Sequence, residues 1–132
     1  MKSMVSRLLA LGWIIMLFGC GGGSTPSNDR LEQAFAQGRS GVWISGHGTV
    51  VRELGGTSAE QRFQVRIGDE LTIVLRRDIQ AASRINVQPE DRLAFHGRYD
   101  FHGGGGTVSL THPDPSQPGG GGWIEVNGVR QD

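Results

Sequence analysis

From residue 42 onward, apolar and polar residues alternate with a period of two, and glycines or prolines interrupt the alternation at short intervals. This period places successive side chains on opposite faces of a strand, one face toward a core and one toward solvent. Residues 62–67 show it most clearly, with apolar residues between Arg62, Gln64 and Arg66 and after the last of them. The chain is therefore predicted to fold mainly as β-structure.

The alternation predicts five main strands, at residues 42–54, 62–67, 71–76, 92–102 and 107–111. In the fourth of these, four apolar residues are expected to face the core: Leu93, Phe95, Tyr99 and Phe101. Gly46 and Gly48 permit a sharp bend or a bulge in the first strand. Residues 77–90 lose the alternation and predict an irregular or helical connection, in which residues 78–82 could form a helical turn and Pro89 ends any helix.

Two local signals lie on either side of these strands. Residues 28–37 predict a short helix that Gly38 can end, and its apolar stripe would lean on a sheet. Near the C-terminus, Asn127-Gly128 supplies both positive φ angles of a type I′ turn. It predicts a hairpin over residues 123–130.

The length and order of these elements favour an OB-like five-stranded barrel with a short N-terminal helix, formed as one domain by residues 28–132. A β-sandwich is the alternative. Closure into a barrel removes free sheet edges, which benefits an exported domain that has no disulfide.

The first 19 residues have the order of a bacterial secretory signal, with Lys2 and Arg7 before an apolar run at residues 8–18. The run is shorter than the roughly 20 residues that a membrane-spanning helix needs. Residues 17–20, Leu-Phe-Gly-Cys, resemble the lipobox of bacterial lipoproteins. Cys20 is also the only cysteine, so it has no partner for an internal disulfide. We therefore expect cleavage of residues 1–19 and attachment of lipid to Cys20.

Residues 20–27 are rich in glycine and serine and are expected to form a flexible tether between the lipid and the domain. Such a lipoprotein would be anchored in the bacterial cell envelope. By analogy with enterobacterial sorting, Gly21 in place of an aspartate favours the outer membrane, facing the periplasm.

Charge argues against binding of nucleic acid through bulk electrostatics. Without residues 1–19, eleven of the thirteen basic side chains remain, against thirteen acidic ones. Counterion release needs many clustered cations. Every remaining cation is an arginine, however, because Lys2 is the only lysine. The guanidinium group pairs with carboxylates and phosphates, so a local anion site remains open.

Five short motifs, in their order and spacing, carry a family resemblance. They are Gly41-Val42-Trp43-Ile44-Ser45-Gly46, Gln61-Arg62-Phe63, Gly97-Arg98-Tyr99, Thr111-His112-Pro113-Asp114-Pro115 and Gly122-Trp123-Ile124. Over about residues 40–128, the chain resembles a bacterial family of small exported proteins, domain of unknown function family 3465. The resemblance implies an OB-like fold and no established activity. Its relatives are richer in histidine, and of those positions only His112 keeps its histidine here.

The polar faces of the predicted strands hold the candidate ligand-binding residues. Arg62, Arg66 and Arg98 are expected on outward faces of neighbouring strands, where they could hold a sugar acid, a phosphate or an acidic strip of a partner protein. Interspersed acidic residues leave a merely solvated face as the alternative. His112 and Asp114 lie in a proline-rich turn, and either a structural role or a place in the site is open to them.

A metal site on the fourth predicted strand is disfavoured. His96 and His102 share one face with Asp100, yet six residues of strand place the two histidines roughly 20 Å apart. We therefore expect no metal and no cofactor.

These observations favour a non-catalytic binding or interaction module that is held at a membrane by its lipid. Its partner would be an anionic ligand or an envelope protein. The alternative is a degenerate or unusual phosphoester hydrolase of the periplasm, which would use His112, Asp114 and the arginines. No nucleophile-elbow pattern supports that alternative.

Overall fold

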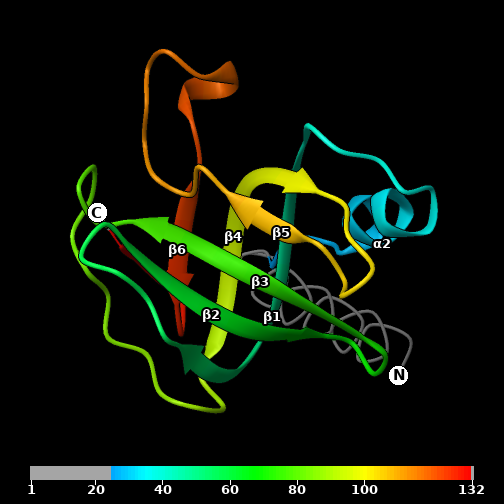
Figure 1. The fold of residues 1–132 in the computed structure, drawn as a ribbon, viewed down its shortest axis with the longest axis horizontal. Helices are drawn as coiled ribbons and strands as arrows, with labels where there is room; N and C mark the ends of the chain where they lie inside the picture. Colours follow the sequence, from blue (N-terminus) through cyan, green and yellow to red (C-terminus); the bar gives the residue numbers. More distant parts are fainter. Residues whose placement is uncertain (1–24, 132) are drawn as a thin grey trace, which may run out of the picture.

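The computed structural model describes residues 25–131, so the predicted signal, Cys20 and most of the predicted tether lie outside the described residues. Figure 1 shows the elements, which are α2 (Asp29–Ala36), β1 (Val42–Leu54), β2 (Glu60–Ile67), β3 (Leu71–Asp78), β4 (Arg92–Asp100), β5 (Thr107–Ser109), the 3₁₀ turn η1 (Pro118–Gly120), β6 (Trp123–Val126) and β7 (Val129–Gln131). Within residues 25–131, no helix is long and apolar enough to cross a membrane.

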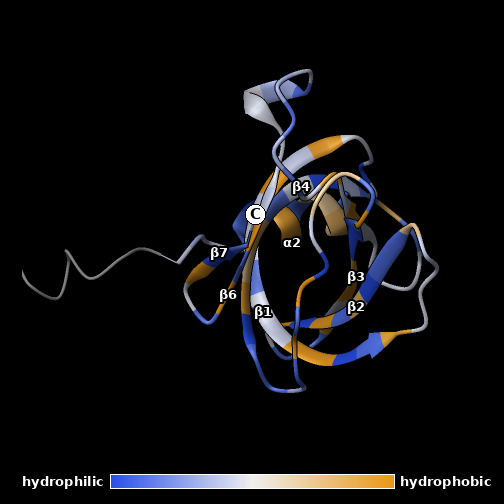
Figure 2. Cartoon of the chain, turned by 90° about the vertical axis from the view of Figure 1, so that its left-hand side faces the viewer, coloured by the Kyte–Doolittle hydropathy of each residue, from blue (hydrophilic) through white to orange (hydrophobic). Residues whose placement is uncertain are grey.

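Five of the strands close into a barrel. Their hydrogen-bonded order is β1-β2-β3-β5-β4, and β4 pairs back onto β1. β5 runs parallel to β3, while the other pairs are antiparallel. The strands form a ring in Figure 2. The OB-like barrel is thus confirmed, and the alternative of a β-sandwich is wrong because the sheet closes on itself.

β1 closes the barrel because it pairs with two different strands. Its residues 42–49 pair with β4, and its residues 49–54 pair with β2 across a bulge after Val50. Gly48 lies just before this change of partner, where a Cβ atom would be 2.4 Å from the carbonyl oxygen of Arg66. Of the predicted bend or bulge, a bulge is present shortly after Gly48. Gly48 itself is required because two backbones approach there more closely than a side chain allows.

The two ends of the barrel are closed by different segments. α2 covers the end near the β2–β3 turn, where Leu31 and Ala34 are buried in the core. The loop of residues 79–91 covers the other end with Ile85 and Val87. The buried amide of Gln61 fixes this loop: its oxygen accepts the Ile85 N–H at 2.8 Å, and its nitrogen donates to the Ile85 carbonyl at 3.0 Å. Both ends are thus sealed without a disulfide.

Two strands end earlier than the sequence predicts. β4 ends at Asp100, so the prediction that Phe101 faces the core is wrong: its side chain is 40% exposed and packs against Phe35. The turn of residues 102–105 begins there and leaves no room for two further strand residues. β5 ends at Ser109 because Leu110 has a φ of 56°, outside the strand region.

The connection after β3 is mainly irregular. It begins with a single helical turn at residues 78–82, as predicted, in which the Ala82 N–H donates to the Asp78 carbonyl at 3.0 Å, and this turn is not continued into a helix. The predicted hairpin is confirmed, with positive φ at Asn127 and Gly128. Its first strand, β6, pairs with β4 and extends the barrel wall.

Substitution of Gly48 by alanine tests the closure. We expect Gly48→Ala to lower the free energy of unfolding by about 1–3 kcal/mol, because the added methyl group overpacks the contact between β1 and β2. Urea denaturation measures the change. Gly55→Ala is the matched control, since a Cβ there meets no atom within 4 Å. Equal stability of the two variants would contradict the close approach of β1 and β2 at Gly48.

Candidate functional site

The outward residues of β1, β4 and β6 line up in rows across the barrel wall. The strand register gives three rows, Thr49–Arg92, His47–Ala94–Glu125 and Ser45–His96–Trp123. Residues in one row lie on neighbouring strands, about 4.8 Å apart. This part of the wall therefore brings together side chains that are distant in the sequence.

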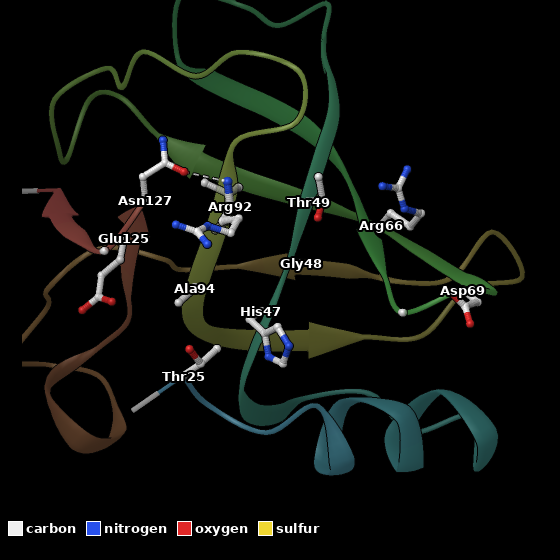
Figure 3. Close-up of a pocket in the computed structure, with 13 residues that line it drawn as sticks. Thr25, His47, Gly48, Thr49, Arg66, Asp69, Arg92, Ala94, Glu125 and Asn127 are labelled. Carbon is white, nitrogen blue, oxygen red and sulfur yellow. Dashed lines mark hydrogen bonds between the residues drawn. The ribbon is translucent and has the colours of Figure 1, made fainter. Parts of the chain in front are cut away.

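A groove of about 910 Å³ crosses the first two rows (Figure 3). Gly48 and Ala94 line it, and their lack of long side chains leaves the wall hollow there. Its polar lining includes His47, Thr49, Arg66, Asp69, Arg92, Glu125 and Asn127. The groove is therefore an open surface site in which polar side chains lie beside apolar parts of the wall.

Two arginines lie on either side of Thr49 in this groove. Thr49 pairs with Arg66 on β2 and with Arg92 on β4, because β1 changes partner at this residue. The two arginines are thus two strands apart, with Cα atoms about 10 Å from each other. Figure 3 shows their side chains flanking the threonine.

The guanidinium groups of Arg66 and Arg92 have no hydrogen bond or ion pair with any residue among 25–131. Five other arginines do have carboxylate partners, namely Arg62, Arg76, Arg84, Arg98 and Arg130. Of the two acids that line the groove, Glu125 pairs with Arg130 at 3.2 Å, and Asp69 lies at the far end beyond Arg66. The guanidinium groups of Arg66 and Arg92 are therefore open to an external anion.

The start of the described chain is bound to the same face. The Nδ1–H of His47 donates to the Pro26 carbonyl at 2.6 Å, and the backbone N–H of His47 donates to Asn28 Oδ1 at 2.8 Å. Because a carbonyl can only accept, Nδ1 must carry the proton. Thr25 lines the groove beside His47 and Ala94 (Figure 3). The chain thus enters the barrel along the groove.

Next to the groove, Trp43, His96, Trp123 and Arg130 form what we call the aromatic ladder. The ring of His96 lies 5.7 Å from Trp43 and 6.3 Å from Trp123, and the Arg130 guanidinium covers Trp123 at 4.3 Å. Ser45 Oγ hydrogen-bonds His96 Nδ1 at 2.8 Å. Burial lowers the pKa of His96 below its usual 6.5, so the ring is neutral at neutral pH.

The structure does not bring the three predicted arginines together. Arg66 lines the groove. Arg62 lies on the same strand, β2, but its guanidinium group donates to the Gly55 carbonyl at 2.6 Å. Arg98 lies on β4, which β1 separates from β2 on one side and β3 and β5 on the other. It pairs with Asp100 at 3.5 Å. Of the predicted arginines, only Arg66 therefore belongs to the groove.

His112 and Asp114 lie in the loop before β6, whereas Arg92 lies opposite the end of that strand. His112 is 6% exposed, and within the described chain its Nδ1 has no hydrogen-bond partner. Asp114 accepts from the Ser116 hydroxyl at 2.7 Å and the Ser116 N–H at 3.0 Å, and these bonds lower the pKa of Asp114. His112 and Asp114 therefore lie in a turn that is remote from the groove.

The described residues contain no group of three side chains placed to hold a metal ion. His96 and His102, which the sequence places on one strand face, make separate contacts. His102 Nε2 hydrogen-bonds Thr107 Oγ1 at 2.9 Å, beyond the end of β4.

Arg92, Thr49 and His47 received no ligand-binding role from the sequence. Their outward orientation was predictable from the alternation. Their meeting with Arg66 was not, because it depends on β1 pairing with two strands, one of which follows it by some 40 residues. The only local sign of this double pairing in the sequence was Gly48, because a glycine within a strand often marks a bulge or a close approach of another backbone.

Acidification tests the effect of partial burial on His96. Because its pKa is lowered in the folded protein, the unfolded chain binds a proton first as the pH falls below 6.5. The free energy of unfolding should therefore decrease between about pH 7.5 and about pH 5.5. His96→Gln should flatten this slope in urea denaturation series. Asp91 and Asp114, whose pKa values are also lowered, titrate below this range. An unchanged slope in the variant would contradict the account.

Comparison with known proteins agrees with the motifs. Residues 14–132 match the sequence profile described as "Protein of unknown function (DUF3465)", which covers most of the chain. None of the curated proteins compared with the chain matches it. The chain, which folds as a small β-barrel, therefore belongs to the DUF3465 family, which is described as proteins of unknown function.

Proposed function

We propose that this protein is a lipoprotein of the bacterial envelope whose barrel binds an oxyanion-bearing ligand between Arg66 and Arg92, without catalysing a reaction. One observation carries the proposal: two guanidinium groups flank Thr49 in a groove, and neither has a carboxylate partner among residues 25–131. Arginine forks match the geometry of phosphate and carboxylate groups. The ligand is therefore a phosphate, a sugar acid or an acidic segment of a partner.

The other groups of the groove suit binding. The Thr49 hydroxyl lies between the two arginines, where it can donate a further hydrogen bond. Asn127 lies at the same end, with its Oδ1 fixed by the Arg92 backbone N–H at 2.9 Å (Figure 3). The hydrolase alternative relies on His112 and Asp114, which are remote from the arginine pair, so no observation favours it.

The envelope address is tested at Cys20. We expect Cys20→Ser to abolish incorporation of labelled palmitate and to move the exported protein from the membrane fraction to the soluble fraction, because the thiol carries the anchor. Immunoblots of fractionated cells measure the distribution, and Ser24→Ala is the control. Retention of the Cys20→Ser protein in the membrane fraction would contradict the lipid anchor.

The anion site is tested with inorganic phosphate. In the soluble Cys20→Ser protein, we expect Arg66→Gln and Arg92→Gln each to weaken phosphate binding by about tenfold, because each removes a charge-assisted hydrogen bond. Chemical-shift titration measures the affinity. Arg52→Gln is the matched control, since Arg52 is exposed and unpaired among the described residues but lies outside the groove. Equal affinities in the three variants would contradict the site, as would no binding at all.

A further inference from the structure

The groove lies at the point where the chain leads toward its expected anchor. Thr25 lines the groove, and the contacts of Pro26 and Asn28 with His47 hold this segment against β1. Five residues lead from Cys20 to Thr25. A chain of that length spans at most about 18 Å when it is fully extended. Lipid on Cys20 would therefore hold this wall of the barrel, rather than the opposite one, close to the bilayer.

The arginines of the groove differ from several others on the barrel in having no carboxylate partner among residues 25–131. Outside the groove, Arg76 of β3 pairs with Glu60 of β2 at 2.6 Å, and Arg84 of the loop of residues 79–91 lies 3.9 Å from Glu53 of β1. In the groove that Thr25 lines, Arg66 of β2 and Arg92 of β4 have no carboxylate partner among the described residues, while Glu125 pairs with Arg130. Arginines without a carboxylate partner attract anionic lipids when they lie near a membrane surface.

The aromatic ladder adds the second feature of an interfacial surface. Trp43 and Trp123 are half-buried on this wall, and Arg130 covers Trp123. Indole rings concentrate at the boundary between headgroups and acyl chains because one part of the ring is apolar and the N–H is polar. Tryptophan and unpaired arginine thus occur together on the wall nearest the expected anchor.

We propose that the groove and the aromatic ladder dock the barrel onto the anionic phospholipid headgroups of the membrane that holds its lipid anchor. The proposal rests on the proposed function, whose oxyanion it identifies as a lipid phosphate. Arg66 and Arg92 bind the phosphates, and Trp43 and Trp123 lie at the depth of the headgroups. Because the anchor already holds the protein at the membrane, the groove meets the headgroups at a high effective concentration, so weak individual interactions suffice.

Tryptophan fluorescence of the intact lipoprotein tests the docking. Loss of Trp13 with residues 1–19 leaves Trp43 and Trp123 as the tryptophans, and both report on this wall. The lipidated protein is reconstituted into vesicles of phosphatidylcholine with and without phosphatidylglycerol, made with brominated or ordinary acyl chains. We expect brominated lipid to quench the fluorescence, more strongly in the anionic vesicles. Arg66→Gln/Arg92→Gln should lose at least half of the quenching, and Arg52→Gln should retain it.

Each outcome separates the two proposals. Equal fluorescence in brominated and ordinary vesicles overturns the docking, and so does quenching that is the same in the double variant. If the Cys20→Ser protein then still binds inorganic phosphate, the proposed anion site stands, and only the proposal that its ligand is a membrane phospholipid is wrong. If that protein binds no phosphate, the proposed function fails as well. A purified protein without lipid on Cys20 also overturns the docking, because the tether would no longer bring the groove to the bilayer.

Discussion

The double pairing of β1 is the constraint on which the rest of the structure depends. One strand is hydrogen-bonded to β4 along its first part and to β2 along its second, and this closes the barrel. The exchange requires the backbones of β1 and β2 to approach more closely at Gly48 than any side chain allows. A chain without disulfides thereby removes the edges of its five-stranded sheet and encloses a core that α2 and the loop of residues 79–91 seal.

The same exchange creates the candidate site. Because Thr49 is the residue at which β1 changes partner, it has a neighbour on each side, and both neighbours are arginines. Gly48 and Ala94 leave the wall hollow beside them. Closure of the fold and formation of the groove thus have one structural cause, so a substitution at Gly48 would disturb both.

The sequence was sufficient for the local features. Alternation predicted the strands because each strand shows its two faces within a few residues, and Asn127-Gly128 predicted the hairpin because turn type depends on two residues. Outward orientation alone did not identify the site. Arg62 and Arg98 face outward as predicted, yet Arg62 donates to a carbonyl and Arg98 lies beside Asp100 on a different part of the wall. Those contacts, and the place of Arg92 opposite Thr49, depend on long-range pairing that no local pattern encodes.

The central claim is that Arg66 and Arg92 hold one anion between them. A double-mutant cycle on phosphate affinity tests it most directly, with Arg66→Gln, Arg92→Gln and the double variant in the soluble protein. Residues that share a ligand are energetically coupled, so the account predicts that the loss in the double variant differs from the sum of the two single losses by at least 0.5 kcal/mol. Additive losses would show that the two arginines act independently and would contradict a shared site.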